Sequence, residues 1–471
     1  MFLNILYNEL KLLNRSKWLI ILFSVILLLF TFASYNGSNN VSKRLSDIAD
    51  VKKEFFEKDS VMLQTLYKIK AGENIETPYW RLPSEPMIVG NQYPRLAIMY
   101  PESLSFLSTG QSDMYTHFIS PRIYGNNFAL DYSEMVNPVQ LLFGNFDLAF
   151  VIIYILPLLI IAFTYNALSK EKELGTFRVI ASQPISTLVW LFHKISIRFF
   201  VFTFFTSLIL VINISIFSFD KFLLNSNLFG LLLLLTGYNL FWFVLAFIIN
   251  IKVNDSSKNS LTLIGLWLLL VLIIPATINQ VGSSLYPTPS RLKMINEIRS
   301  INKENESQQN EIMDSYLRTH PEFVQENNES QFGFWHNYFA SEKAMEEKTK
   351  PLLQDYDSQL KKQQVLIEGF RFLSPAILMQ QSLNKFASTS ELHYNDFKKQ
   401  VFEFSDEWRN YLIPMLFKNQ KFNIDKYDQL PSFKYNNRIE HNIWLNVFII
   451  LTINIIMLFM FSTKNLEYRS V

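Results

Sequence analysis

Six stretches of the chain consist almost entirely of apolar, uncharged residues and are separated by polar segments. Each is close to the length of about 20 residues that a helix needs to cross the hydrocarbon core of a bilayer. They lie at residues 18–34, 148–168, 199–219, 228–250, 261–279 and 443–461. The pattern predicts an all-α polytopic membrane protein with six transmembrane helices.

Two long segments, residues 35–147 and 280–442, contain the amphipathic periodicity of soluble helices, with apolar residues at spacings of three and four. We expect helices at residues 41–70, 291–317, 338–372 and 391–417. Residues 77–138 are rich in Pro and aromatic residues and are expected to form short strands or irregular structure. Together the two segments predict one large, mainly helical domain outside the membrane.

Residues 2–15 have a further amphipathic pattern. Leucines line one face of the expected helix and polar residues another: Leu3, Leu6, Leu10 and Leu13 against Asn4, Asn8, Lys11 and Arg15. This pattern suits a helix that lies flat in the membrane interface, and a cytoplasmic extension of the first span is the alternative. The expected division of the chain is residues 1–34, 35–147, 148–279, 280–442 and 443–471.

Lysine and arginine residues near the spans predict the orientation. They precede the first span, lie between the second and third spans and between the fourth and fifth, and follow the sixth. With six spans, all four groups fall on one side, which the positive-inside rule makes cytoplasmic. Both termini and the loop at residues 169–194 are therefore expected in the cytoplasm, with the two long segments on the other side.

Composition and missing motifs exclude several kinds of chemistry. The 471 residues include no Cys, and the six His form no HExxH pair, so neither a thiolate site nor a zinc-protease site is indicated. The sequence contains no GxxxxGK[ST] phosphate loop and no GxSxG elbow. A net charge of +2 gives no indication of a nucleic-acid partner. We expect no enzyme activity, bound metal or cofactor on this chain itself.

A short charged connector, SKEKELGTFRVIASQPIS, occupies residues 169–186 between the second and third spans. Its first residues continue the span as a charged helix, Gly175 permits a turn, and Pro184 prevents the helix from continuing. Composition alone leaves two interpretations open. The connector is either a stiff element that docks into a partner protein or a solvated loop.

The connector resembles a pattern of ABC type-2 exporter permeases, E-x-E-x-G-T followed by apolar positions and a Pro, in their cytoplasmic loop. Phe177 stands where that family most often has Leu. Three further runs resemble a branch of the superfamily with large extracytoplasmic insertions after the first and fifth spans. They are NPVQLLFGNFDLAFVIIYILPLLIIAFTYNALS, LAIMYPESLSFLSTGQSDMY and FLSPAILMQQSLNKFASTSELHYNDFKKQVFEF.

The resemblance implies a permease subunit of an ATP-driven exporter in the bacterial cytoplasmic (inner) membrane. Such exporters work as two permeases and two ATPases, so the implied partners are cytoplasmic ATPase subunits, a second permease (a copy or a homologue) and membrane lipid. ATP and Mg²⁺ would be bound by the ATPase. The residues implied to contact it are Glu171, Glu173, Gly175, Thr176, Arg178 and Pro184.

The sequence does not identify a substrate. Polar residues within the spans are candidates for a pathway: Asn213, Asn239, Asn446 and Asn454. The aromatic residues of the long segments are compatible with a peptide, a lipid or an amphiphilic natural product. A second hypothesis is a mechanical transducer, in which the ATPase moves the outer domain to regulate a periplasmic partner without transport. A membrane enzyme is a third, but the spans contain no clustered acid, His or nucleophile.

Overall fold

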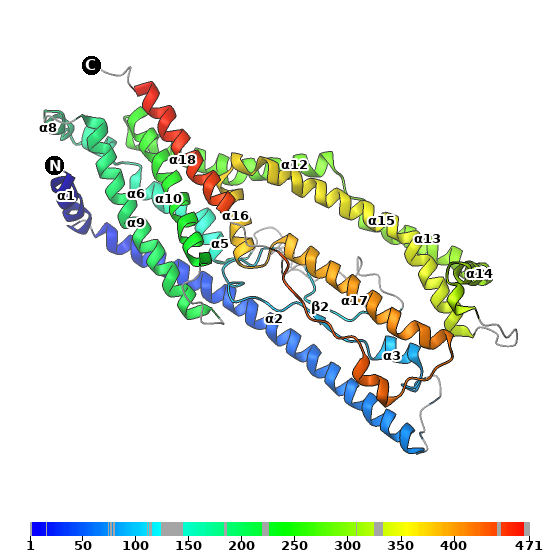
Figure 1. Ribbon diagram of the computed structural model, residues 1–471. Helices are drawn as coiled ribbons and strands as arrows, with labels where there is room; N and C mark the ends of the chain where they lie inside the picture. Colours follow the sequence, from blue (N-terminus) through cyan, green and yellow to red (C-terminus); the bar gives the residue numbers. More distant parts are fainter. Residues whose placement is uncertain are drawn as a thin grey trace.

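The computed structural model describes residues 2–465 apart from residues 16, 74, 76, 77, 79, 80, 111, 113, 114, 124–144, 183–185, 219–225, 308, 325–332 and 440–443. The molecule is elongated and mainly helical (Figure 1). A bundle of apolar helices, here called the apolar bundle, occupies one end. A mainly helical domain, here called the distal domain, extends from it.

The described residues include five helical stretches long and apolar enough to cross a membrane, as expected for a membrane protein. They are Trp18–Ala71, Leu148–Glu173, Thr187–Phe217, Leu228–Lys252 and Ser256–Leu285. A sixth apolar helix, α18 (Trp444–Asn465), has a shorter apolar stretch, Trp444–Met460. The helices that form the apolar bundle, in chain order, are α2 (Trp18–Ala71), α5 (Leu148–Phe150), η3 (Val151–Ile155), α6 (Leu156–Thr164), α9 (Thr187–Phe217), α10 (Ser226–Lys252), α11 (Ser256–Trp267), η4 (Leu268–Ile273), α12 (Ile274–Leu285) and α18.

Helix α2 runs without interruption from the apolar bundle into the distal domain over 54 residues (Figure 1). The sequence predicted a span at residues 18–34 and a separate helix at residues 41–70, and that separation is wrong. Gly37 has a packing role within α2, because a Cβ at this position would overlap the carbonyl oxygen of Phe106. The Asn and Gly residues around Gly37 disfavour a helix, yet α2 stays helical there, where it packs closely against the chain at Phe106.

Two π-helical turns interrupt the apolar helices, each just before a proline. Pro157 follows η3 at the start of α6, and Pro275 follows η4 at the start of α12. A proline has no N–H to donate, so the regular ladder is disturbed on its N-terminal side. Side chains hydrogen-bond carbonyls of these turns: Tyr238 Oη to Ile153 O (2.8 Å), Trp267 Nε1 to Tyr154 O (3.2 Å) and Ser374 Oγ to Leu270 O (2.6 Å).

The distal domain is built from both long segments. Its elements are α3 (Pro86–Gln92), the antiparallel strands β1 (Ala97–Ile98) and β2 (Phe118–Ile119), α13 (Arg291–Ser307), α14 (Gln309–Thr319), η5 (Pro321–Phe323), α15 (Phe334–Phe370), η6 (Arg371–Leu373), α16 (Pro375–Phe386), α17 (Glu391–Phe417) and η7 (Ile424–Gln429). The helix predicted at residues 391–417 is confirmed, and the one at 338–372 lies at α15. Residues 291–317, expected as one helix, are covered by α13 and α14.

One hydrophobic core joins the two long segments in the distal domain. Met62 and Leu66 of α2 pack in it together with Trp408 of α17 and Phe339 of α15. The indole N–H of Trp408 also donates to the carbonyl of Gly90, 3.2 Å away, in the first long segment. The prediction that the two loops fold together is therefore confirmed for the described residues.

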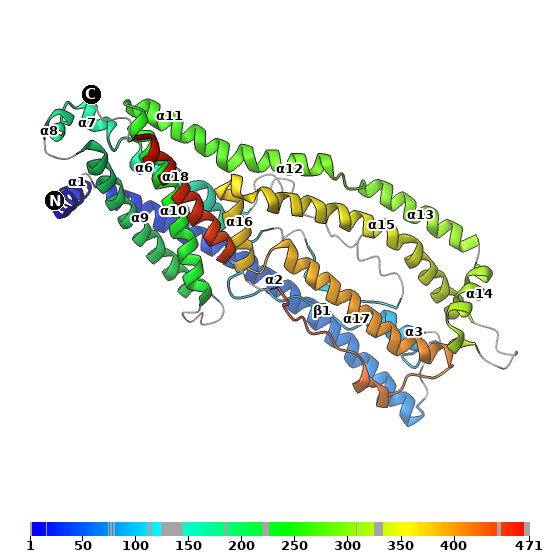
Figure 2. The same ribbon diagram turned by 45° about the horizontal axis from the view of Figure 1, so that its top comes forward.

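Helix α16 was not expected as an element, yet it joins the two parts of the molecule. Its buried apolar residues, Met379 and Leu383 among them, belong to the core of the apolar bundle. It packs against α10 and α18, and Asn446 Nδ2 donates to Ser382 Oγ at 2.9 Å. The run FLSPAILMQQSLNKFASTSELHYNDFKKQVFEF, residues 372–404, is here called the second loop motif. Its start is thereby fixed on the end of the bundle that faces the distal domain (Figure 2).

Candidate functional site

The charged connector forms two short helices at the end of the apolar bundle that also carries α1 (Phe2–Arg15) and the C-terminal end of α18 (Figures 1 and 2). These helices are α7 (Ser169–Glu173) and α8 (Phe177–Ala181), here together called the connector hairpin. No residue of α8 is buried, and the side chains of Leu174 and Val179 are each 65% exposed. The hairpin therefore presents apolar side chains away from the bundle.

Gly175 sets the angle between α7 and α8. Its φ of +76° lies in the left-handed region that L-residues with a side chain disfavour. A Cβ at this position would meet nothing within 4 Å, so conformation rather than close approach requires the glycine. The hydroxyl of Thr176 closes the turn by donating to a carboxylate oxygen of Glu171 at 2.5 Å.

A buried cluster of four charges holds α7 to the bundle. Lys194 of α9 lies 3.0 Å from a carboxylate oxygen of Glu171 and 4.0 Å from one of Glu9 in α1. Arg198, one turn further along α9, pairs with Glu9 at 2.6 Å and donates to the carbonyl of Phe163 at 2.6 Å. The two negative charges and the two positive charges of this cluster balance, and the cluster joins α1, α7 and α9.

A second set of contacts holds α7 to the turn between α10 and α11. Glu173 accepts a hydrogen bond from the backbone N–H of Ser256 at 2.8 Å, at the N-terminus of α11, where a carboxylate is favoured by the helix dipole. The hydroxyls of Ser169 and Ser256 lie 2.8 Å apart, and Lys172 Nζ donates to Asn254 Oδ1 at 2.5 Å. The connector hairpin is thus bound to two different helices of the bundle.

The structure brings five of the six predicted contact residues into this one hairpin, while Pro184 lies outside the described residues. Arg178 is exposed on α8. Glu171 and Glu173 were expected to face a partner, but each already has a partner within the chain. A direct role of these carboxylates in docking stays a prediction. The exposed residues of the hairpin include the apolar Leu174 and Val179 and the charged Lys170, Glu173 and Arg178.

Sequence reasoning missed Glu9 and Lys194 as members of this site. Glu9 is the one acidic residue in α1, where the other charged residues are Lys11 and Arg15. A single acid in an otherwise basic amphipathic helix is a signal that could have pointed to a buried partner. Lys194 was expected in a loop, but α9 begins at Thr187, seven residues earlier.

The four asparagines proposed for a pathway lie at separate places in the molecule, and each is buried. Asn239 reaches the hydroxyls of Thr203 and Thr206 in α9, and Asn454 of α18 donates to Gly237 O in α10 at 3.0 Å. Asn446 bonds Ser382, and Asn213 bonds its own helix at Ile209 O. In the described part of the chain, Asn239, Asn446 and Asn454 therefore join neighbouring helices, whereas Asn213 bonds within α9. A role of the four toward a substrate stays a prediction.

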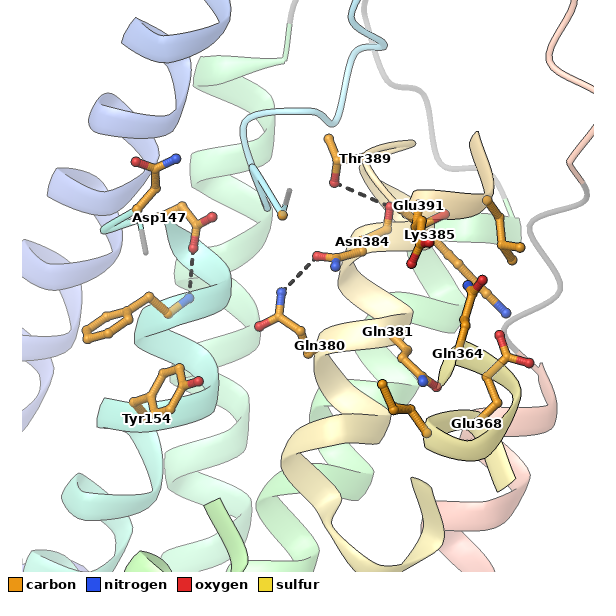
Figure 3. A pocket seen from close by; sticks show the side chains of 16 residues that line it. Asp147, Tyr154, Gln364, Glu368, Gln380, Gln381, Asn384, Lys385, Thr389 and Glu391 are labelled. Atoms are coloured by element: carbon orange, nitrogen blue, oxygen red, sulfur yellow. Dashed lines mark hydrogen bonds between the residues drawn. The ribbon is translucent and has the colours of Figure 1, made fainter. Parts of the chain in front are cut away.

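A polar cavity of about 440 Å³ lies where the apolar bundle meets the distal domain (Figure 3). Its walls come from η3 and the residue before α5, the end of α15, α16 and the start of α17. Asp147 caps α5, accepting from the backbone N–H groups of Phe150 and Thr109, both at 2.8 Å. Asn384 accepts from Ser108 and Gln380 at 2.6 and 2.8 Å. The run LAIMYPESLSFLSTGQSDMY, which contains Ser108 and Gly110, and the second loop motif therefore meet at this cavity.

Burial raises the pKa of the Glu391 carboxyl at the cavity wall, and the neighbouring charge of Glu368 raises it further. A hydrogen bond from Asn395 and the charge of Lys398 act in the opposite direction. Lys385 is the cation among the residues that line the cavity. Among the described residues, no group of three or more His, Asp or Glu is placed to hold a metal ion.

Comparison with known families covers the distal domain only. Residues 291–436 match the family model described as Domain of unknown function (DUF3526). The match extends from the start of α13 to the chain that follows η7, and so includes α16 and the second loop motif. No curated protein and no solved structure matches the chain.

Proposed function

We propose that this chain is the membrane-spanning permease subunit of an exporter that is driven by separate ATP-hydrolysing subunits. The observation that carries the proposal is the connector hairpin. It is exposed along α8 and yet fixed to the bundle at two places, Glu171 to Lys194 and Glu173 to Ser256. An exposed element with rigid internal anchors is suited to transmit force from a docked partner.

The two anchors suggest how ATP hydrolysis would act on the bundle. ATPase subunits that close on ATP and Mg²⁺ would push against the connector hairpin in the cytoplasm. The Glu171–Lys194 pair would pass this displacement to α9, and the Glu173–Ser256 bond would pass it to α11. A second permease, a copy or a homologue, would complete the pathway in a bacterial inner membrane. The transported compound would be a peptide, a lipid or an amphiphilic natural product.

The test separates docking from folding. Leu174 and Val179 are exposed side chains, so Leu174→Ser and Val179→Ser should leave the fold intact but weaken an apolar docking surface. Membranes of the native host, treated with photoreactive azido-ATP, should yield a labelled protein that co-purifies with the wild-type chain. The labelled protein should be lost from the double variant Leu174→Ser/Val179→Ser.

Leu285, at the other end of the bundle and 60% exposed, provides a matched control. Leu285→Ser removes a similar apolar side chain far from the connector hairpin and should retain the labelled protein. Equal recovery from the double variant and the wild type would contradict docking at the hairpin. Absence of any azido-ATP-labelled protein would contradict the exporter proposal itself.

A mechanical transducer is a second candidate, favoured by the length of α2. At 1.5 Å per residue, its 54 residues span roughly 80 Å, so one rigid rod joins the bundle to the distal domain. In reconstituted complexes, ATP should then change the labelling rate of a Cys introduced by Ser300→Cys. Ser46→Pro, which breaks α2 between the two parts, should abolish the change, and Ser46→Ala should keep it. A labelling rate that ATP leaves unchanged argues against the transducer.

A further inference from the structure

The cavity between the apolar bundle and the distal domain presents hydrogen-bonding groups that have no partner among the described residues. The side chains of Gln364, Gln381 and Glu368 are half-buried at its wall and, within the described part of the chain, make no hydrogen bond or ion pair. Figure 3 shows them gathered on one side of the cavity. Half-buried polar groups without protein partners favour a polar occupant.

The charges of the lining restrict the kind of occupant. Among the described residues that line the cavity, three have carboxylates, Asp147, Glu368 and Glu391, and one, Lys385, has an ammonium group. The carboxylate of Asp147 is already used by two backbone N–H groups. The negative charge of Glu368 acts on the carboxyl of Glu391, and the charge of Lys398 acts on it in the opposite direction. A further positive charge placed between the two carboxylates would relieve their repulsion.

Aromatic rings complete the wall on the bundle side. Phe150 and Tyr154, on α5 and η3, face the same cavity. Ring faces attract ammonium groups and also cover apolar carbon chains. The lining therefore combines carboxylates for a positive charge, amides for hydrogen bonds and rings for an apolar body.

We propose that this cavity binds a ligand that carries a protonated amine on an apolar body. The inference deepens the proposed function, on which it rests for the ligand's role as exported substrate. The cavity lies at the end of the bundle remote from the connector hairpin, where a substrate that had crossed would reach the distal domain. Binding itself is a property of the described residues and requires no ATPase.

Three probes of one length test the charge requirement: 1,8-diaminooctane, 1,8-octanediol and suberate, which carry two positive, no and two negative charges. Calorimetric titration uses the full chain in phosphatidylcholine nanodiscs, in phosphate buffer free of other amines. Saturable heat is expected from the diamine alone. Equal heats from all three probes, or no saturable heat from the diamine, would overturn the proposal without reference to any variant.

Substitutions place the binding in this cavity. Glu368→Gln and Glu391→Gln each remove one negative charge with little change in shape and should weaken diamine binding by about tenfold or more. Glu347→Gln changes an exposed acid elsewhere on α15 and should bind as the wild type does. Unchanged affinity in both cavity variants would overturn the assignment. Because the titration contains no ATPase, loss of amine binding and loss of docking at the connector hairpin are separate outcomes.

Discussion

The ammonium nitrogen of Lys194 lies 3.0 Å from a carboxylate oxygen of Glu171, which joins the third apolar helix to the connector hairpin. The side chain of Lys194 is only 7% exposed, and that of its second partner, Glu9, is 5% exposed. Charges buried to this degree require partners, because an unpaired ion in the interior has lost its hydration. The pair therefore fixes where α7 lies relative to α9.

Removing one member of this pair should destabilise the protein. Lys194→Met leaves two carboxylates without their shared cation, and breaking a buried pair typically costs about 3–5 kcal/mol. We expect the lower end of that range, because the Glu171 side chain is 21% exposed. Thermal unfolding followed by Trp fluorescence should show a clear fall in midpoint. Lys170→Met, at an exposed position in α7 next to Glu171, should have little effect.

The double variant separates pairing from general damage. Lys194→Met/Glu171→Gln removes both charges, so it should lose less stability than the sum of the two single changes. Strict additivity of the single changes would show that the 3.0 Å contact does not couple them. The Glu171–Lys194 contact would then not be an anchor of the connector hairpin.

The sequence was sufficient for features that repeat along the chain. Runs of apolar residues predicted the helices of the bundle, and amphipathic periodicity predicted α17 with its observed bounds. The charge cluster could not be predicted in the same way. Its members come from three separate segments, α1, α7 and α9, and nothing in the spacing of Glu9, Glu171 and Lys194 states that the chain brings them together.

Local helix propensity gave wrong predictions at positions where tertiary packing determines the structure. The run around Gly37 suggested the end of the first span, yet α2 continues through it beside the chain at Phe106. The sequence singled out α16 only as part of a motif and not as a helix. Its buried residues pack into the core of the apolar bundle, a tertiary contact that its own sequence does not state. The cavity beside it combines residues from five elements, α5, η3, α15, α16 and α17, so no single stretch of sequence contains its pattern.

Gly175 and Gly265 make a matched pair for a test of backbone conformation. A Cβ would meet nothing within 4 Å at either position, but only Gly175 has a positive φ. Gly175→Ala should destabilise the turn by roughly 1–2 kcal/mol because of the left-handed conformation. Gly265→Ala, inside α11, should instead stabilise its helix by up to about 1 kcal/mol. Unfolding midpoints that move in the same direction would contradict this conformational explanation.

The topology can be tested because the chain has no Cys of its own. Ser182, just after α8, and Ser300, in α13, are both exposed. Helices α8 and α13 lie toward opposite ends of the molecule (Figure 2). In intact spheroplasts, a membrane-impermeant maleimide should label the Ser300→Cys variant and should label Ser182→Cys only after lysis. Labelling of Ser182→Cys from outside would place the connector hairpin on the wrong side for a cytoplasmic ATPase.

The stability of the protein should depend on pH through Glu391. Burial and the charge of Glu368 raise the pKa of this carboxyl in the folded state, so the folded protein holds the proton to a higher pH than the unfolded chain does. The resulting stabilisation is complete below the unfolded pKa and is lost as pH rises through the folded pKa. One group can contribute no more than about 1.4 kcal/mol per pH unit.

Glu391→Gln should therefore be more stable than the wild type at pH 8, and the difference should shrink toward pH 4, where the wild-type carboxyl is protonated. Unfolding midpoints measured across this range check the sign. Gln381→Asn, a change without a titrating group at the same cavity, should shift the midpoint equally at every pH. A Glu391→Gln variant whose advantage grew on acidification would mean that the folded protein favours the ionised carboxylate. The cavity would then already hold a positive charge beside it.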